Sequence, residues 1–328
     1  MRILNAQDVR TALPMKDTIQ AMKSAYAALS DGRAEIPLRT SLPITPHNAT
    51  TLFMPAYIQG QNEEALAIKI VSLFPENPEH GLDFIQAAVL VLDPKTGQSL
   101  ALLEGSTLTA IRTGAASGAA TDLLARPNSS MVAIFGAGAQ GRTQLEAVCT
   151  VRQIETVLIV DTDHQRAQTF VDEMRGRSRI PDDIRIARGP KQALSTADII
   201  CTATTSIIPV YDAGDVKPGT HINGVGSFTL EMIENPPEML ENAAVFVDSR
   251  EAVMAEAGEI IAAINKKLFF PAELTELGEV VLGNAPGRKS DKQITFFKSV
   301  GVAVQDAMAA QLALKNAEAM GLGQEVDF

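Results

Sequence analysis

Three basic residues stand in surroundings that are apolar or nearly free of side chains. Lys69 lies within the apolar run "ALAIKIVSLF", Arg39 within "IPLRTSLP", and Arg112 within "TAIRTGAASGAAT". A buried ammonium is costly unless an anion accompanies it, and a lysine in such a place shifts its pKa readily. Arginine can bind a carboxylate through two parallel hydrogen bonds. Residues of these types could hold the carboxylate of a small substrate and, at Lys69, exchange a proton with it.

Each of the three also has an ordinary structural explanation. An arginine in a loop is usually solvated, and a lysine within a strand often lies on the exposed face. A helix of small residues, with Gly114 and Gly118 on one face, packs closely against a neighbour whether or not it binds a ligand. Arg112 is expected near the N-terminal end of that helix, where the dipole favours an anion. Sequence spacing alone does not bring the three side chains together, so their convergence is a hypothesis.

A second pattern indicates a dinucleotide. The stretch "MVAIFGAGAQGRTQLEAV" has a G-x-G-x-x-G motif between an apolar strand pattern and a helix pattern. The first glycine permits a tight turn, the second lets the backbone approach a pyrophosphate, and the third allows close packing of helix and strand. The following helix presents unpaired N–H groups to the phosphates. A glycine turn in a fold that binds no nucleotide is the structural alternative. The predicted cofactor-binding loop is Gly136, Ala137, Gly138, Ala139, Gln140 and Gly141.

The choice of cofactor depends on Asp161, which ends the apolar run "TVLIV" 20 residues after Gly141. A carboxylate there accepts hydrogen bonds from the ribose hydroxyls and repels a 2′-phosphate, and no arginine immediately follows it. This favours NAD(H); NADP(H), and a helix N-cap role for Asp161, are the alternatives. The segments "TATTS" and "GVGS" end later strands, where open parallel sheets bind ligands. The cofactor contacts predicted there are Thr202, Ala203, Thr204, Val225 and Ser227.

The elements that position these residues form two patterns. Residues 14–31 have the periodicity of an amphipathic helix, a strand-rich block follows, and a second helix runs to about Arg126 from an N-cap at Ser106 or Thr107. From 131, short apolar strands alternate with helices, which predicts βαβ units and a parallel sheet. A last helix at about 300–320 could pack back on the first part. We predict an α/β protein: a Rossmann-type doubly wound parallel sheet at 126–298 and a second α+β domain made of 1–125 with 299–328.

Composition narrows the partners. The 328 residues are 46% hydrophobic and 20% charged, with a formal net charge of -11. Such a charge repels nucleic acid and anionic lipid, so neither is an expected partner. The two cysteines and four histidines have no metal-ligand spacing, and we expect no metal site and no disulfide. The start "MRILNAQDVR" lacks the apolar core of a signal peptide, and no run is long enough to span a membrane. The expected location is the cytoplasm.

The chain resembles the ornithine cyclodeaminase/mu-crystallin family over nearly all of its length. The resemblance is carried by "TAIRTGAASGAAT", "VAIFGAGAQG", "TATTS" and "GRKSDKQITFFKSVG", and by the order of the two domains. It implies a two-domain NAD(P)-dependent enzyme that acts on amino acids, or on imines of 2-oxo acids, by hydride transfer at C2. It also implies a homodimer built through the non-Rossmann domain, which would then be the substrate-binding and dimerisation domain.

The resemblance assigns site residues as well. Arg39, Lys69 and Arg112 match the family's substrate-carboxylate and catalytic positions, and Met54 matches a residue that lines the substrate pocket. Two further residues, Lys298 and Ser299, match the part of the family's chain that passes near the nicotinamide.

At one place the chain departs from the cyclodeaminases. Those enzymes continue from "NGVG" to an aspartate that holds the substrate amine, whereas the segment here is "INGVGSFTLEM", with Phe228 at that position. A phenyl ring cannot pair with an ammonium or take a proton. This favours the imine-reducing branch, which converts Δ1-pyrroline-2-carboxylate or Δ1-piperideine-2-carboxylate to L-proline or L-pipecolate, with Phe228 against the substrate ring. The alternatives are ornithine cyclodeaminase (L-ornithine to L-proline and ammonia), an alanine-type dehydrogenase, and a binding protein without turnover.

Overall fold

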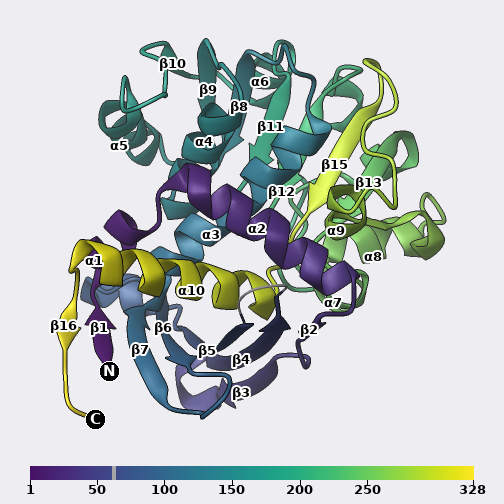
Figure 1. Ribbon diagram of the computed structural model, residues 1–328. Helices are drawn as coiled ribbons and strands as arrows, with labels where there is room; N and C mark the ends of the chain where they lie inside the picture. Colours follow the sequence, from purple (N-terminus) through teal and green to yellow (C-terminus); the bar gives the residue numbers. More distant parts are fainter. Residues whose placement is uncertain (61–63) are drawn as a thin grey trace. The chain divides into compact units, whose positions relative to one another are not determined.

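The computed structural model describes residues 1–60 and 64–328, which form two compact units (Figure 1). Unit 1 consists of Met1–Arg112 and Val302–Phe328, and unit 2 is Thr113–Gly301. The sequence placed the divisions after residues 125 and 298. The first division instead falls within helix α3 (Gly105–Leu124), and an unbroken helix gives no sequence pattern at which to divide a chain. The C-terminal helix belongs to unit 1, as its predicted return to the first part of the chain requires.

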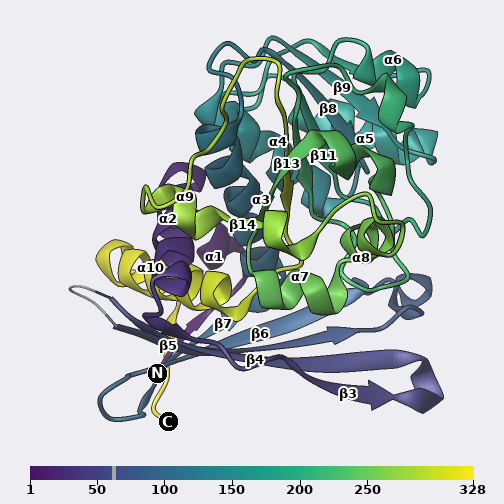
Figure 2. The same cartoon turned by 90° about the vertical axis from the view of Figure 1, so that its right-hand side faces the viewer.

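Unit 1 is built on a mixed sheet. Its strand order is β16-β1-β7-β6-β5-β4-β2, with β3 paired to β4. Only β1 and β7 run parallel among these pairs. Helices α2 and α10 contact each other and lie over one face of this sheet (Figure 2). The elements are β1 Arg2–Leu4, α1 Ala6–Ala12, α2 Met15–Ser30, β2 Ala34–Glu35, β3 Thr40–Ile44, η1 Thr45–His47, β4 Ala49–Gln59, β5 Glu64–Leu73, η2 Asn77–His80, β6 Ile85–Leu92, β7 Ser99–Glu104, α10 Ala303–Met320 and β16 Gln324–Glu325.

Local sequence explains these elements with one correction. Pro14 precedes α2, and Met15, Ile19, Met22 and Tyr26 form its buried stripe, as the periodicity predicts. Helix α3 begins at Gly105, and its first free N–H groups are satisfied by the side chain of the residue before it. Glu104 accepts from the backbone N–H groups of Ser106 and Thr107 at 2.7 and 2.9 Å. The predicted N-cap at Ser106 or Thr107 is therefore wrong, because the last residue of β7 performs that role.

Unit 2 is a doubly wound parallel sheet with strand order β10-β9-β8-β11-β12-β15-β13-β14. Chain order reverses between β8 and β11, which is the topological switch point of a Rossmann fold. The predicted fold class, a Rossmann-type sheet with a second α+β unit, is confirmed. The elements are β8 Met131–Phe135, α4 Ala139–Val151, β9 Thr156–Val160, α5 His164–Met174, β10 Ile184–Ile186, α6 Pro190–Leu194, β11 Ile199–Thr202, η3 Ala213–Asp215, β12 His221–Gly224, η4 Pro237–Asn242, β13 Ala243–Val247, α7 Arg250–Glu256, α8 Gly258–Asn265, η5 Pro271–Glu273, β14 Thr275–Glu276, α9 Leu277–Val281 and β15 Ile294–Lys298.

The small residues of α3 allow α4 to approach closely. A Cβ atom added to Gly114 would lie 2.5 Å from the backbone oxygen of Thr143 in α4. Both cysteines are buried and free, and burial raises the pKa of Cys149 and of Cys201 to about 12, so neither is a reactive thiol. Among residues 1–60 and 64–328, no helix is long and apolar enough to cross a bilayer.

Candidate active site

Lys69 lies on the inner face of the sheet of unit 1. Residues of β5 alternate between a buried and a more open face, and Ala65, Ala67, Lys69 and Val71 are the buried set. Lys69 is 2% exposed, while Ile70 beside it is 39% exposed. The alternative of a lysine on an exposed strand face is therefore wrong. The ammonium is placed among apolar neighbours, where it requires an anion.

The anion that accompanies Lys69 is Asp306, in the first turn of α10. Its Oδ2 lies 2.7 Å from Lys69 Nζ, and its Oδ1 lies 2.9 Å from Arg112 Nε. Neither carboxylate oxygen nor Arg112 Nε makes a well-aligned hydrogen bond to any described residue. The two contacts are therefore close charge pairs, and both cations share one carboxylate. Asp306 was not predicted from the sequence, because its only signal is an acid among the small and apolar residues of "SVGVAVQDAMAA".

Gln305 fixes the orientation of Arg112. Its Oε1 accepts from Arg112 Nη1 at 2.7 Å and from the backbone N–H of Val302 at 2.9 Å. Its Nε2 donates to the hydroxyl of Tyr26 at 2.5 Å. Gln305 is fully buried, so this one amide both caps α10 and holds the guanidinium. The helix dipole does not contribute as predicted, because Arg112 is two turns inside α3 and the dipole effect is confined to the first turn.

Met54 and Arg39 belong to the same region of unit 1. Met54 is buried and pairs directly opposite Lys69 across β4 and β5, so the two side chains are neighbours on the inner face. Arg39 is half-buried just before β3, and its charge acts on the titration of Lys69. The structure therefore brings together Lys69, Arg112, Met54 and, within electrostatic range, Arg39.

The pKa of Lys69 is lowered from 10.5 to about 7. Burial is the largest cause; Asp306 opposes the shift, and the charges of Arg112 and Arg39 add to it. Near neutral pH the group can therefore carry charge in one state and release a proton in the other. Lys69 and Arg112 share one carboxylate, which leaves a positive excess that a carboxylate ligand would balance.

The glycine loop of unit 2 has the geometry that its motif predicts. Gly136 has φ +97°, and a Cβ there would lie 2.5 Å from the backbone oxygen of Ala203. A Cβ on Gly141 would overlap the backbone oxygen of Gly136, which shows the close helix–strand packing expected of the third glycine. Gly138 is the N-cap of α4, has no side-chain cap, and faces open space where its Cβ would be. Ala139 is exposed at the first position of the helix.

These features fit a dinucleotide. The N–H groups of α4 are available to a pyrophosphate, and the space at Gly138 admits its close approach. Gln140 Oε1 is buried and has no hydrogen-bond partner within the described residues, so a polar group of a ligand could satisfy it.

Asp161 lies directly after β9, as predicted for a ribose-binding acid. Its Oδ2 accepts from the backbone N–H of Ala137 at 2.7 Å, and its Oδ1 accepts from the N–H of Asp163 at 2.8 Å. Asp163, not Asp161, is the N-cap of α5. An arginine does lie beside the acid, although none follows it immediately: Arg166 Nη2 is 3.2 Å from Asp161 Oδ1. Arg166 lies in the first turn of α5, and that turn places it next to Asp161. Its side chain is 51% exposed.

The loops after β11 and β12 lie side by side at the carboxyl edge of the sheet. A Cβ on Gly226 would overlap the backbone oxygen of Thr204. Ala203 and Thr204 are half-buried, whereas the remaining predicted contacts of these loops are buried: Thr202, Val225 and Ser227. Phe228 is half-buried and follows directly after this buried set.

The side chains of Lys298 and Ser299 are enclosed. Lys298 is 0% exposed, and its Nζ donates to the backbone oxygen and to Oγ of Ser227 at 2.6 and 2.5 Å. Ser299 Oγ donates to Asp248 at 2.8 Å. The cofactor contacts predicted for these residues and for Ser227 stay predictions.

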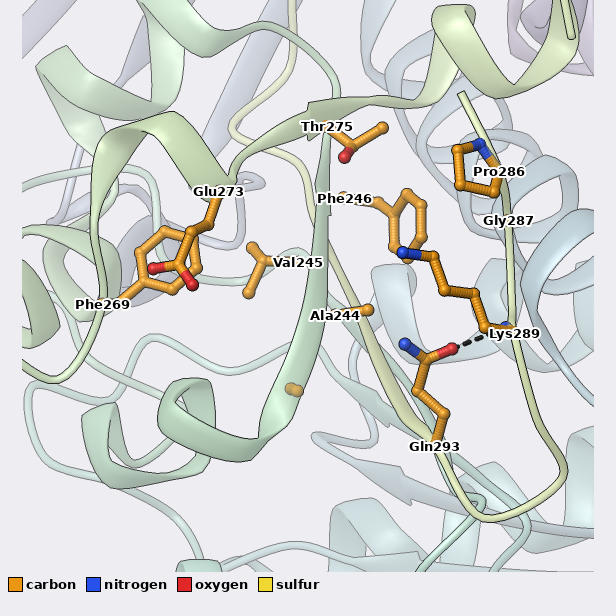
Figure 3. Close-up of a pocket in the computed structure, with 11 residues that line it drawn as sticks. Ala244, Val245, Phe246, Phe269, Glu273, Thr275, Pro286, Gly287, Lys289 and Gln293 are labelled. Atoms are coloured by element: carbon orange, nitrogen blue, oxygen red, sulfur yellow. Dashed lines mark hydrogen bonds between the residues drawn. The ribbon is translucent and has the colours of Figure 1, made fainter. Parts of the chain in front are cut away.

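A cavity of about 270 Å³ in unit 2 lies apart from all these residues (Figure 3). It is bordered by Ala243 and Ala244 at the start of β13 and by Gln293 just before β15. Open α/β sheets bind ligands at the carboxyl ends of their strands, and this cavity lies at the amino ends. The charged residues at its rim, Glu273 and Lys289, are exposed. We therefore do not assign it to the active site.

Comparison with known proteins identifies the family. The ornithine cyclodeaminase/mu-crystallin family model matches residues 1–321. The chain belongs to this family. It is 38% identical to a Delta(1)-pyrroline-2-carboxylate reductase of Bacillus cereus, over 330 residues and all of both chains. It is similar to the structure of Thermococcus litoralis Delta(1)-pyrroline-2-carboxylate reductase in complex with NADH and L-proline, with 41% identity and a TM-score of 0.94 over 99% of this chain and 100% of that one. An archaeal alanine dehydrogenase dimer with bound NAD shares 32% identity, with a TM-score of 0.91 over 100% and 99% of the chains.

The pairing of Asp161 with Arg166 leads to a prediction about cofactor choice. In Asp161→Ala the carboxylate that repels a 2′-phosphate is gone and Arg166 is released to bind one. We expect the affinity for NADPH relative to NADH to rise at least about tenfold, because a like-charge contact is replaced by an attractive one. Direct binding of both reduced cofactors, followed by their fluorescence, measures the ratio. The double variant D161A/R166A is the control, and an equal gain there would show that Arg166 has no part in it.

Proposed function

We propose that the protein is an NAD(H)-dependent reductase of cyclic imino acids, which converts Δ1-pyrroline-2-carboxylate to L-proline and Δ1-piperideine-2-carboxylate to L-pipecolate. The observation that carries the proposal is the cluster of Lys69, Arg112 and Asp306, a buried site with excess positive charge for a carboxylate. Relatives named Delta(1)-pyrroline-2-carboxylate reductase, similar over the whole chain, support this substrate. NADP(H) is the alternative cofactor.

Different residues of unit 1 bind the substrate carboxylate and supply the proton. Arg112, oriented by Gln305, presents its guanidinium to the substrate carboxylate, and Arg39 adds positive charge. Lys69 contributes to the same grip and can supply the proton that the ring nitrogen gains when the imine becomes an amine. NADH supplies the hydride when bound, in the loop whose fit is described above. Most of the rate enhancement would come from orientation of the bound reactants.

The surroundings of Phe228 disfavour ammonia elimination. The cyclodeaminases need an acid at this position, and the nearest one along the chain, Glu231, is exposed. The next, Glu234, is buried, but its two oxygens already accept from the backbone N–H groups of Thr204, Gly226 and Ser227. Neither is available to a substrate ammonium. A phenyl group is compatible with the apolar ring of a cyclic imine.

The decisive assay follows NADH absorbance with Δ1-pyrroline-2-carboxylate. We expect saturable NADH consumption and formation of L-proline. Arg112→Ala should lower kcat/KM at least about 100-fold, because it removes charged hydrogen bonds to the substrate, and should leave the Kd for NADH unchanged. Arg33→Ala, which removes a surface arginine paired with Asp31, is the matched control and should retain activity.

Three outcomes would contradict the proposal. Formation of proline and ammonia from L-ornithine with catalytic NAD, without reduction of the imine, would identify a cyclodeaminase. NAD-dependent oxidation of L-alanine in preference to imine reduction would identify the second candidate, which the similarity to the archaeal alanine dehydrogenase favours. NADH binding with no turnover of any of these would indicate a binding protein.

The pKa of Lys69 leads to a pH prediction. Lys69 is protonated below about 7 and loses its charge as pH rises through that value. Carboxylate binding and proton supply both weaken above this pH, so kcat/KM should fall there. Lys69→Arg keeps its charge throughout and cannot release a proton, so kcat should drop while KM for the imine stays flat above pH 7. If the fall in kcat/KM above pH 7 persists unchanged in K69R, it reflects titration of the substrate nitrogen. That result would contradict the assignment to Lys69.

We also propose a homodimer formed through the outer face of the unit 1 sheet. This face is apolar, although the open face of an antiparallel sheet is normally polar, and two of its residues, Ile68 and Ile70, lie at its centre in β5. The alanine dehydrogenase relative is a dimer. Further apolar residues that point outward, alternating with the buried ones, are Phe53, Pro55, Leu66, Leu90, Leu92 and Leu102.

Charges on that face should separate the two copies. The double variant Ile68→Glu/Ile70→Glu is expected to halve the mass measured by light scattering, because opposed carboxylates would be buried in an isologous interface. Met254→Glu, at an apolar residue of similar exposure (37%) in unit 2, is the control and should leave the mass unchanged. A dimer that persists in I68E/I70E would place the interface elsewhere.

A further inference from the structure

Three charged side chains of unit 2 are fully enclosed and have no part in the reaction proposed above. Glu234, Glu259 and Lys298 are each 0% exposed. Enclosed charges are costly unless they are paired and hydrogen-bonded. All three are directed toward Val225–Phe228, the segment that follows β12, which we call the β12 loop.

Ser227, at the centre of the β12 loop, is bound through every polar group it has. Its backbone N–H donates to Glu234 Oε2 at 2.9 Å, and its backbone oxygen accepts from Lys298 Nζ at 2.6 Å. Its hydroxyl donates to Glu259 Oε2 at 2.6 Å and accepts from Lys298 at 2.5 Å. Lys298 Nζ also lies 3.1 Å from Glu259 Oε1, which accounts for its three donors.

Glu234 joins the β12 loop to the loop after β11. Its Oε1 accepts from the N–H of Thr204 at 2.5 Å, and its Oε2 accepts from the N–H of Gly226 at 2.6 Å. One carboxylate therefore bonds two segments that touch at Gly226. Burial raises the pKa of Glu234, and Lys298 and the Thr204 N–H oppose that shift. Hydrogen bonds from the backbone N–H groups of the two loops stabilise the carboxylate in the interior.

Asn235 extends the same network to the end of β11. Its Nδ2 donates to Thr202 Oγ1 at 3.1 Å and to Glu259 Oε1 at 3.2 Å. The Tyr211 hydroxyl donates to Asn235 Oδ1 at 2.8 Å. The ends of β11, β12 and β15 are thus connected by hydrogen bonds at the edge where the cofactor-contacting loops begin.

We propose that Glu234 and the Glu259–Lys298 pair are positioning residues, which set the conformation of the β12 loop and thereby the places of Phe228 and of the backbone that faces the cofactor. The inference rests on the proposed function for the role of Phe228. Glycines at 224 and 226, just before Ser227, leave the loop with little steric restraint of its own, so these hydrogen bonds supply it. A site held in this way keeps its reactive geometry without a rearrangement on binding.

Two variants of the holoenzyme test the proposal. Glu259→Gln/Lys298→Met keeps the side-chain volumes and removes both charges. Buried sites tolerate the removal of a whole ion pair. The double variant also removes the ammonium that donates to the backbone oxygen of Ser227. Glu234→Gln places an amide N–H₂ against backbone N–H donors. E259Q/K298M should keep a thermal midpoint near that of the wild type, whereas E234Q should lower it, as D198N does, and remain folded at the assay temperature. In both variants the Kd for NADH should rise about tenfold and kcat/KM for Δ1-pyrroline-2-carboxylate should fall about 100-fold, as for small misplacements of reacting groups.

Asp198→Asn is the matched control for E234Q. Asp198 is also a buried carboxylate that accepts backbone N–H groups, those of Ser130 and Met131 at 3.0 and 3.2 Å, but it precedes β11 at the opposite edge of the sheet. It should lower the thermal midpoint and leave the Kd for NADH and kcat/KM unchanged.

The outcomes separate the two proposals. If a folded E259Q/K298M or E234Q protein keeps its NADH Kd and kcat/KM within about threefold of wild type, the network is structural only and the inference is overturned. A loss that merely tracks the fraction of folded protein, or an equal loss in D198N, also overturns it. If the wild type does not reduce the imine, the proposed function fails, whereas the NADH Kd of the variants still decides the positioning role. Should one variant fail to fold, the other decides.

Discussion

The pairing of two buried cations with one buried carboxylate is the interaction on which unit 1 depends. Lys69 comes from a strand, Arg112 from α3 and Asp306 from α10. A buried cation without its partner costs several kcal/mol, so the sheet and α3 need α10 to return from the far end of the chain. Gln305 and Arg112, hydrogen-bonded here, are 193 positions apart in sequence. In the sequence, all of unit 2 is inserted between these two residues of unit 1.

The cluster is stable but not electrically balanced. Burial lowers the pKa of Lys69 to about 7; the charges of Arg112 and Arg39 add to that shift, and Asp306 opposes it. A carboxylate ligand would reverse that effect, because an added negative charge favours the ammonium form. Binding of an anionic substrate would then prepare Lys69 as a proton donor.

The sequence predicts the features whose physical cause is local. The glycine loop, Asp161 and the alternation of strands and helices depend on neighbours within a few tens of residues, and the structure places each as expected. Asp306 and Glu259 were missed, since their roles depend on partners from distant segments. Arg166 was missed because one helical turn returns it to Asp161. Lys298 was expected near the cofactor from resemblance, and only its full enclosure shows that its side chain is directed at Ser227.

Completeness of hydrogen bonding distinguishes the two buried ionic sites of this chain. In unit 2, each donor of Lys298 has an acceptor, and Glu234 and Glu259 are satisfied by loop N–H groups, a hydroxyl and the ammonium. In unit 1, Arg112 Nε and both oxygens of Asp306 lack aligned hydrogen bonds to the described residues, and cations outnumber anions. A complete network can only hold its surroundings in place, since an added ligand would find no free donor. An incomplete network has both charge and hydrogen-bond donors for a ligand. We therefore assign substrate binding to the cluster of unit 1 and positioning to the network of unit 2.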